Sequence, residues 1–420
     1  MIKENMRPNC DALIVGAGPA GLMAAYCAAA RGADVMLAER EERYPKKLLI
    51  TGKGRCNVAN ACDSETFFAN IRRGGAFLRS SVSAFGPYDV MEFFESRGVP
   101  LKAERGNRVF PESDRAADIA ESLKKASLSA GARVSTGRVK EILTENGEVR
   151  GARLYDGSEI TCRAAVIATG GLSYPKTGST GDGFRIAAAL GHTVTPAYPS
   201  LVPLECEGGD CAELQGLSLR NATLSLEVEG KTIYEELGEL MFTHFGVSGP
   251  LALTASAYLA GSDPVGARLV IDLKPALDEK ALDKRLLRDF SQSLNREFKN
   301  SLGALLPQKL IPIIVRRSGI DPEKKINAVT ARERASLLEC LKRFTLKVTR
   351  TRPIDEAIVT AGGVSTREID PKTMQSKLIK NLHFAGEVID ADGFTGGFNL
   401  GIAFATGHAA GSHCLKGDFK

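Results

Sequence analysis

Cysteine and histidine occur in this sequence without the spacings that thiol redox sites or metal sites require. The nine cysteines are irregularly spaced and include no Cys-x-x-Cys pair. This absence excludes a disulfide framework, argues against disulfide exchange and agrees with a reducing compartment. The five histidines, at positions 192, 244, 383, 408 and 413, show no ligand spacing with cysteine or acidic residues. We therefore expect no structural metal.

Long uninterrupted hydrophobic runs are also absent. The longest apolar stretch, residues 13–30, is broken by glycines and indicates a strand followed by a helix rather than a membrane span of about 20 residues. The polar first eight residues lack the features of a secretory signal. We expect a cytoplasmic protein that makes no membrane contact.

The charge of the chain is only mildly basic, with a formal net charge of +5. Three basic clusters, at residues 72–73, 316–317 and 347–352, are able to contact phosphate groups, although solvated surface charge explains each of them equally well. The charge therefore permits RNA as a partner without requiring it.

Glycine is abundant, with 43 of 420 residues compared with an average of about 7%. One glycine-rich cluster follows an apolar strand and precedes a helix of small residues; it contains Gly16, Gly18, Pro19, Ala20 and Gly21. In a dinucleotide fingerprint the first glycine permits a tight turn, the second lets the backbone approach the pyrophosphate, and the third lets helix and strand pack closely. The helix N-terminus then faces the phosphates with free N–H groups and the positive end of its dipole.

A second strand, residues 34–40, ends in an acid 18 residues after Gly21. This acid, Glu39, is placed to bind ribose hydroxyls, and its charge repels a 2′-phosphate. The expected ligand is therefore FAD or NAD, and NADP is disfavoured at this site.

The other end of the chain carries a second glycine-rich segment, in which a strand passes two acids and leads into a helix of small residues. Its candidate cofactor residues are Gly386, Glu387, Asp390, Gly396, Gly397, Asn399 and Leu400. One of the acids would hydrogen-bond the ribityl or pyrophosphate part of a flavin, and the N–H groups near Asn399 and Leu400 would face its ring. A glycine-rich loop before a core helix is the alternative, but the pairing with the first segment favours FAD over NAD.

Between the two ends the pattern is first α/β and then β-rich. Helices are expected at residues 76–84, 89–97 and 115–131. Residues 132–169 alternate as strands do, with hairpin signals at Asn146-Gly147 and Asp156-Gly157. The last of these strands runs into Thr169 and Gly170 and resembles the return strand of FAD-binding folds, where the backbone passes near the dinucleotide.

After residue 191 prolines separate extended segments, which indicates an inserted domain. Strands are expected at residues 222–228, 267–273 and 344–349. Helical signals follow the second of these strands: an apolar stripe at 282, 286, 290, 294 and 298, a helix at 308–317, and a capping box at Thr330 and Glu333. The insertion is therefore β-rich with a small helical part, and the first domain is discontinuous.

Five segments together resemble the HI0933-like flavoproteins, and the resemblance covers almost the whole chain. These segments are residues 15–21, 47–57, 177–183, 242–250 and 386–399. The resemblance implies an α/β fold with a Rossmann-like FAD-binding domain, an inserted β-barrel-like domain and a small helical subdomain, with FAD held non-covalently. The corresponding boundaries are 1–194 with 353–420, 195–276 with 343–352, and 277–342.

The family pattern also implies the cofactor contacts. They are Glu39, Asn57, the backbone at Val139, Glu387, Asn399 and Leu400. Further candidate cofactor-binding residues in the sequence are Arg40, Lys47, Arg55, Cys56, Thr169 and Gly170. One departure from the pattern is Lys53, which lies between two glycines where relatives often have a third.

The reaction is also implied by the resemblance. Members of the family have been assigned as reductases of conjugated C=C bonds, either in a uracil of 23S ribosomal RNA or in unsaturated 3-oxo bile acids, and an aminoacetone oxidase assignment exists as well. The chain has one complete dinucleotide fingerprint, so any NAD(P)H would bind transiently as the electron donor.

Cys56 and His244 are the candidate acids for such a reduction, because both lie in glycine-rich motifs and titrate nearer neutrality than most side chains. Structural roles are the alternative for both, as a small residue beside Gly54 and as a loop hydrogen-bonder. An alternative of another class is a flavin-bound RNA-binding scaffold with little turnover.

Overall fold

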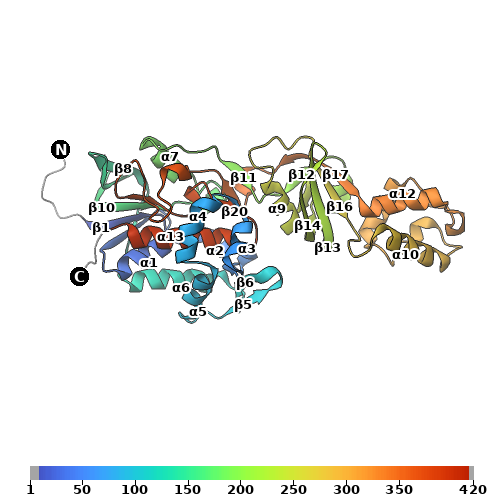
Figure 1. Cartoon of the computed structure of the whole chain (residues 1–420), viewed down its shortest axis with the longest axis horizontal. Helices are drawn as coiled ribbons and strands as arrows, with labels where there is room; N and C mark the ends of the chain where they lie inside the picture. The colour runs from blue at the N-terminus through green and yellow to red at the C-terminus, as the bar shows by residue number, and fades with distance from the viewer. Residues whose placement is uncertain (1–8, 416–420) are drawn as a thin grey trace. The chain divides into compact units, whose positions relative to one another are not determined.

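The computed structural model describes residues 9–415 (Figure 1). The chain divides into two compact units: unit 1 is Met1–Ser200 with Ile354–Lys420, and unit 2 is Leu201–Pro353. The polar first eight residues, on which the expectation of no export signal depends, lie outside the described range. Within that range no helix is long and apolar enough to cross a membrane.

Unit 1 is built on a mainly parallel sheet. Its parallel strands lie in the order β7 (Arg133–Thr136), β2 (Val35–Glu39), β1 (Cys10–Val15), β10 (Glu159–Ile167) and β19 (Leu382–Phe384). In the register Val15 lies opposite Ile167, and Ile167 lies opposite Phe384. The carboxyl ends of these strands therefore meet at one edge of the sheet, where ligands of such folds bind.

An antiparallel meander extends the sheet beyond β10. It consists of β8 (Val139–Glu145) and β9 (Glu148–Leu154). Asn146 and Gly147 both have positive φ, at 54° and 74°, as a two-residue hairpin turn requires. Gly157, in the second turn, has a φ of 88°. Both predicted hairpins are confirmed.

Two helices of small residues, α1 (Pro19–Ala30) and α13 (Phe398–His413), lie side by side in unit 1 (Figure 1). A Cβ on Gly407 would lie 2.4 Å from the carbonyl oxygen of Ala20, and one on Gly411 would lie 2.2 Å from that of Ala24. The helix backbones approach so closely because glycine recurs every four residues on one face of α13. This packing brings the two ends of the sequence together.

The remaining elements of unit 1 are short. Its helices are α2 (Lys46–Ile50), α3 (Ser64–Ala69), α4 (Gly75–Ala84), α5 (Pro87–Glu95), α6 (Ala116–Ser129) and α7 (Asp182–Ala189). Its small sheets pair β3 (Ala59–Asn60), β6 (Arg108–Pro111) and β5 (Leu101–Glu104), then β20 (Asp392–Gly393) with β4 (Ile71–Arg73), and β11 (Tyr198–Ser200) with β18 (Val359–Ala361). The three helices expected between residues 76 and 131 are confirmed as α4, α5 and α6.

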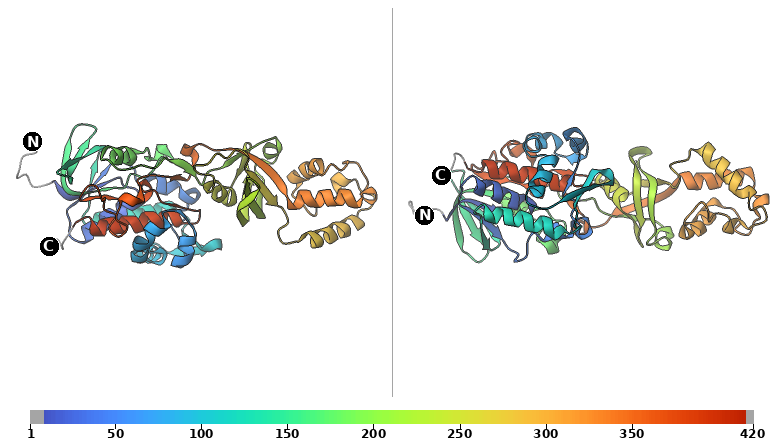
Figure 2. Two further views of the ribbon diagram at one scale, coloured as in Figure 1. Left: turned by 45° about the horizontal axis from the view of Figure 1, so that its top comes forward. Right: turned by 90° about the horizontal axis from the view of Figure 1, so that it is seen from below.

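Unit 2 contains a closed six-stranded barrel, which confirms the predicted barrel-like insertion (Figure 2). The strands follow the order β12 (Leu204–Cys206), β15 (Gly246–Ser248), β14 (Lys231–Phe242), β13 (Ser218–Val228), β16 (Arg268–Asp272) and β17 (Phe344–Thr351). Closure leaves no unpaired sheet edge around the barrel.

Between β16 and β17 the chain forms α10 (Glu279–Ser291), α11 (Ile311–Ser318) and α12 (Ala331–Lys342). The capping box is confirmed, because the Thr330 hydroxyl accepts from the Glu333 N–H at 3.2 Å and the Glu333 carboxylate accepts from the Thr330 N–H at 2.8 Å. The apolar stripe was predicted too long: α10 ends at Ser291 and Leu294 is 50% exposed. The chain turns there, and the Phe298 N–H bonds to the Lys324 carbonyl instead of continuing the helix.

Candidate functional site

The three fingerprint glycines differ in what surrounds them. Gly16 has a φ of 100°, and a Cβ on it would lie 2.7 Å from the Ala168 carbonyl oxygen. A Cβ on Gly21 would lie 1.9 Å from the Gly16 carbonyl oxygen. At Gly18 the nearest atom to such a Cβ is 3.9 Å away. Gly16 and Gly21 are thus required by the turn and the packing, as predicted, whereas Gly18 leaves one side of the loop open.

The N-terminus of α1 adjoins this open side. Pro19 occupies the first helical position, and the first backbone bond of the helix runs from the Leu22 N–H to the Gly18 carbonyl at 2.9 Å. The N–H groups of Ala20 and Gly21 therefore have no acceptor within the helix. Together with the helix dipole they suit a diphosphate.

Glu39 lies at the end of β2, beside the same loop. Its carboxylate accepts hydrogen bonds from the Ala17 N–H at 2.6 Å and the Glu41 N–H at 2.9 Å. The Glu39 carbonyl accepts from the Gly137 N–H at 2.9 Å, which brings the start of β8 and the buried Val139 to this end of the sheet. The arrangement suits a ribose and its adenine, and the carboxylate charge would repel a 2′-phosphate.

Arg40 points toward the segment 177–183. Its guanidinium donates to the Thr180 hydroxyl at 2.9 Å and lies 3.5 Å from the Asp182 carboxylate, which Arg138 also holds with two bonds of 2.8 Å. Burial raises the pKa of Asp182, but Arg138 and the neighbouring arginines outweigh this effect and hold it below its usual range.

The same segment packs against the turn after β10. A Cβ on Gly183 would lie 2.3 Å from the Thr169 hydroxyl, and one on Gly170 would lie 3.0 Å from the Ser179 hydroxyl. Gly170 also has a φ of 72°. The motif at 177–183, noted from the sequence only through the family resemblance, therefore fixes the turn that carries Thr169 and Gly170.

A half-buried ion pair connects α2 to the C-terminal glycine-rich segment. Lys47 lies 2.6 Å from the Glu387 carboxylate, which also accepts hydrogen bonds from the Ser173 hydroxyl at 2.9 Å and the Thr360 N–H at 2.8 Å. Burial raises the pKa of Glu387, but the Lys47 charge and these hydrogen bonds outweigh burial, and the pKa lies below its usual value. The carboxylate is therefore permanently ionised at neutral pH. Ser173 and Thr360 were missed from the sequence because neither belongs to a recognisable motif.

The C-terminal glycine-rich segment contacts the N-terminal one directly. A Cβ on Gly386 would lie 2.8 Å from the Ala20 Cβ, and the Gly386 N–H donates to the Thr406 hydroxyl at 2.9 Å. Gly397 has a φ of 100°, and a Cβ there would lie 2.3 Å from the Ala59 carbonyl oxygen. The Gly396 carbonyl accepts from the Asn60 side chain at 3.0 Å.

Asn399 fixes the loop in front of α13. Its side chain accepts from the Gly393 N–H at 2.9 Å and donates to the Gly393 carbonyl at 2.8 Å and the Phe394 carbonyl at 3.2 Å. The first backbone bond of α13 runs from the Gly401 N–H to the Gly397 carbonyl at 3.0 Å. The N–H groups of Asn399 and Leu400 thus point out of the helix end, as they would to face a flavin ring.

Buried acceptor oxygens test whether these residues fit FAD. The side-chain oxygens Asn57 Oδ1, Thr169 Oγ1, Asp390 Oδ1 and Asp392 Oδ1 are buried without a hydrogen-bond partner. Native proteins rarely leave such atoms unsatisfied. The ribose and ribityl hydroxyls of FAD are hydrogen-bond donors of the kind that Asn57, Thr169 and Asp390 need, so these residues fit this group. Three of the four were predicted, and Asp392 was not.

Two sequence candidates have their side chains engaged elsewhere. Arg55 donates to Asp114 at 2.8 Å and to Glu104 at 3.3 Å, and its guanidinium lies 4.2 Å from the centre of the Phe110 ring. The Cys56 thiol is fully buried, and burial raises its pKa to about 12 against an opposing hydrogen bond from Thr51. These contacts argue against a cofactor contact by the Arg55 side chain and against Cys56 as an acid that reaches substrate.

His244 belongs to unit 2, where it is exposed. Its ring packs edge-on against Phe245, with the two ring centres 4.9 Å apart.

Lys53 has a φ of 59°, between Gly52 and Gly54 with φ values of 56° and 86°. A left-handed backbone explains why glycine is usual at this position, and Lys53 adopts it at a steric cost of about 1–2 kcal/mol.

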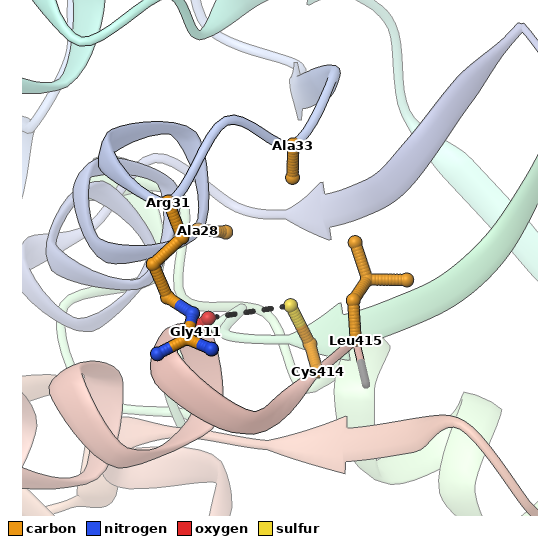
Figure 3. Close-up of a pocket in the computed structure, with 6 residues that line it drawn as sticks. All are labelled: Ala28, Arg31, Ala33, Gly411, Cys414 and Leu415. Carbon is orange, nitrogen blue, oxygen red and sulfur yellow. Dashed lines mark hydrogen bonds between the residues drawn. The ribbon is translucent and has the colours of Figure 1, made fainter. Parts of the chain in front are cut away.

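A small hollow lies away from this site, at the C-terminal ends of α1 and α13 (Figure 3). It is lined by Ala28, Arg31, Ala33, Gly411, Cys414 and Leu415, and the Cys414 thiol donates to the Gly411 carbonyl at 3.4 Å. Since α1 has 12 residues, this end lies about 18 Å from the phosphate-facing end. The lining carries none of the predicted cofactor residues. Across residues 9–415 no group of three or more His, Cys, Asp or Glu side chains is arranged to hold a metal ion.

The chain is similar to proteins of known activity over nearly its whole length. A 3-dehydro-bile acid delta(4,6)-reductase from Clostridium scindens is 31% identical over 405 residues, which cover 95% of this chain and 97% of that protein. A ribosomal RNA dihydrouridine synthase from Escherichia coli is 29% identical, with 95% of this chain and 96% of that protein covered.

A solved structure also shares the fold. The 3-ketosteroid delta1-dehydrogenase from Sterolibacterium denitrificans aligns with 96% of this chain and 99% of its own at a TM-score of 0.51 and 13% identity. Residues 10–413 match the family described as HI0933-like protein Rossmann domain. The chain therefore belongs to the HI0933-like family and is a FAD-dependent oxidoreductase.

Proposed function

We propose that the chain reduces conjugated C=C bonds and that its substrate is a uracil of 23S ribosomal RNA, which becomes dihydrouridine. The observation that carries the proposal is the contact of Gly386 with Ala20, which brings the C-terminal glycine-rich segment against the N-terminus of α1. Reduced FAD, when bound there, supplies a hydride. Two relatives, each matched over 95% of this chain, are named as a ribosomal RNA dihydrouridine synthase and a 3-dehydro-bile acid delta(4,6)-reductase, and these names support the proposal.

In this proposal each part of the cofactor has its own protein contacts. The N–H groups at the start of α1 bind the pyrophosphate, and Glu39 binds the ribose. Thr169 and Asp390 accept hydrogen bonds from the ribityl hydroxyls, and the N–H groups at the start of α13 hold the electronegative edge of the ring. NAD(P)H binds transiently as the electron donor, and the enzyme acts in the cytoplasm.

A small enone, such as an unsaturated 3-oxo steroid, is the second candidate substrate, and the surface charges favour it. In unit 2 the Glu205 carboxylate accepts from Arg350 and Arg352, each at 2.7 Å. Asp210 similarly accepts from Arg317 at 2.6 Å. The basic clusters at 316–317 and 347–352 thus have carboxylate partners, which RNA phosphates would have to displace.

Deletion of the gene tests the RNA proposal directly. We expect one dihydrouridine of 23S ribosomal RNA to be lost, and to return when the wild-type gene is restored. A complementing gene that encodes Gly18→Ala is the matched control for loss of the cofactor. The added Cβ would lie 3.9 Å from the Ala168 carbonyl oxygen, so the substitution should weaken FAD binding without disturbing the fold. An unchanged modification in the deletion strain would exclude the RNA substrate.

Purified protein separates the remaining alternatives. Anaerobic addition of NADPH or NADH is expected to bleach the flavin absorbance, and a 3-oxo-Δ4 steroid or a ribosomal RNA transcript is expected to restore it. Restoration by the steroid alone would establish the small enone. Reduction of the flavin by aminoacetone would establish an amine oxidase, and a flavin that cycles with none of these compounds would support a non-catalytic scaffold.

A further inference from the structure

Asp392 is a buried acid that no sequence motif singled out. It lies in β20, only 1% exposed, and its Oδ2 accepts a hydrogen bond from the fully buried Ser200 hydroxyl at 3.1 Å. Its Oδ1 lies 3.7 Å from the Arg73 guanidinium and has no hydrogen-bond partner. One oxygen of this carboxyl group is thus fixed by Ser200, and the other is buried without a hydrogen-bond partner.

The position of Asp392 is fixed relative to the start of α13. The next residue, Gly393, is bound on both its N–H and its carbonyl by Asn399, in the first turn of that helix. On the other side β20 pairs with β4, where Asp392 lies opposite Arg73. A Cβ on Gly74 would lie 2.8 Å from the Ala391 Cβ, so the two segments pack without a gap. Asp392 is therefore held beside the helix end that suits the flavin ring.

Other acids near the site are poorer proton donors. The Cys56 thiol is fully buried, and burial raises its pKa to about 12. Burial, with the charge of Glu356, also raises the pKa of the Tyr174 phenol. Glu387 is held ionised by Lys47 and has no proton to give.

We propose that Asp392 is the acid that protonates the substrate carbon during reduction, an inference that rests on the reductase function proposed above. Reduced FAD, when bound, would supply the hydride and both electrons, so that a C–H bond forms at the β-carbon as the π bond breaks. The O–H bond of Asp392 then breaks, and its proton forms the C–H bond at the α-carbon. The substrate is reduced, FAD is oxidised, and the Asp392 carboxylate takes a new proton from water.

The groups that face Asp392 suit this role. Burial raises its pKa to about 6, whereas Arg73, the Ser200 hydroxyl and Arg72 lower it, and the charge of Asp390 raises it. A general acid works best when its pKa lies near the operating pH. After the proton has left, Arg73 and Ser200 stabilise the carboxylate.

Reoxidation of the reduced flavin by oxygen and by an organic substrate distinguishes this role of Asp392 from a structural one. Asp392→Asn and wild-type holoenzyme are reduced anaerobically with dithionite and then mixed with oxygen, a 3-oxo-Δ4 steroid or a ribosomal RNA transcript. Reoxidation by oxygen protonates no carbon, so we expect it to be unchanged. Reoxidation by the organic substrate should slow by about 100-fold or more, as loss of a general acid does. Equal rates of the variant and wild type with that substrate would overturn the proposal.

Ser200→Ala provides a second variant that keeps the carboxyl group. Loss of the hydroxyl removes a hydrogen bond that lowers the pKa of Asp392. The pH above which substrate-driven reoxidation declines should therefore move upward, while oxygen-driven reoxidation stays unchanged. An unshifted profile would contradict the assignment even if Asp392→Asn fails to fold.

A spectroscopic readout is independent of turnover. In infrared difference spectra of the oxidised holoprotein, a protonated carboxyl band should disappear between pH 5 and pH 7 in wild type and be missing from Asp392→Asn. Absence of this band from wild type would overturn the proposal. If wild type itself is reoxidised by neither substrate, the reductase function fails and the proton-donor role falls with it, a result distinct from an active Asp392→Asn enzyme.

Discussion

Replacing Lys47 by methionine removes the cation that faces Glu387 while keeping a side chain of similar length. The two side chains are 22% and 20% exposed, and the ion pair spans 2.6 Å. Removing one partner of a fully buried pair costs about 3–5 kcal/mol. Partial exposure screens the charges, and Glu387 keeps its hydrogen bonds from Ser173 and Thr360. We therefore expect Lys47→Met to lower the free energy of unfolding by about 2–3 kcal/mol at pH 7.

The effect should depend on pH in a defined direction. In wild type the pKa of Glu387 lies below its usual value, so its contribution to stability is present above the unfolded-state pKa of about 4.3 and is lost as the pH falls through the folded-state pKa. Without Lys47, burial is opposed only by hydrogen bonds, and the pKa of Glu387 rises. The folded variant then binds the proton more tightly than the unfolded chain, so its stability falls as the pH rises. The difference between the two proteins should be smallest near pH 4 and largest at neutral pH.

Flavin fluorescence provides the assay, because the chain has no tryptophan and released FAD reports unfolding of unit 1. Thermal unfolding of wild type and Lys47→Met is followed from pH 4 to pH 8 at one FAD concentration. Lys46→Met is the matched control, because Lys46 pairs with Glu41 in a more exposed position, with side chains 35% and 28% exposed, and should cost less than about 1 kcal/mol at any pH. A pH-independent loss in Lys47→Met, or one no larger than in the control, would refute the reasoning.

Three further predictions concern the stability of the protein and its FAD content. Gly18→Ala should keep its free energy of unfolding within about 1 kcal/mol of wild type but bind FAD weakly. Gly21→Ala should lose stability, because its Cβ would lie 1.9 Å from a backbone oxygen. Equal effects of the two substitutions would show that Gly18 does not face the cofactor. Gly411→Val should cost about 3 kcal/mol or more by overpacking against Ala24, and a normal melting curve would contradict the described packing. Asp392 has its pKa raised to about 6, so wild type should lose about 2 kcal/mol of stability as the pH rises from 4 to 7, a slope that Asp392→Asn should lack in urea titrations.

Features encoded by neighbouring residues could be predicted from the sequence. Gly16 has a φ of 100° and Gly21 packs against the Gly16 carbonyl oxygen, so each has a local reason to be glycine, and the turn at Asn146-Gly147 needs two adjacent residues with positive φ. The capping box at Thr330 spans a single helical turn. In all of these the determining contact lies within a few residues, or within one strand-turn-helix unit, so the sequence pattern carries the geometry.

Features that depend on distant partners could not be predicted in this way. Arg55 lies in a glycine-rich motif, yet Asp114, 59 residues later, binds its guanidinium. The helix predicted to continue past Leu294 ends at Ser291, because the Phe298 N–H bonds to the Lys324 carbonyl rather than along the helix. The sequence around Asp392 gives no sign that this acid is buried, because β4 and Ser200, which cover it, are distant in the chain. Sequence spacing carries no information on such contacts, because chain folding alone brings the partners together.

The C-terminal glycine-rich segment contains two carboxyl groups whose surroundings shift their pKa values in opposite directions. Glu387 has its pKa lowered beside Lys47, and Asp392, five residues later, has its pKa raised to about 6. Pairs of carboxyl groups that the protein drives apart in this way divide the roles of permanent anion and proton carrier between them. Both groups belong to unit 1, as do all the residues that suit FAD.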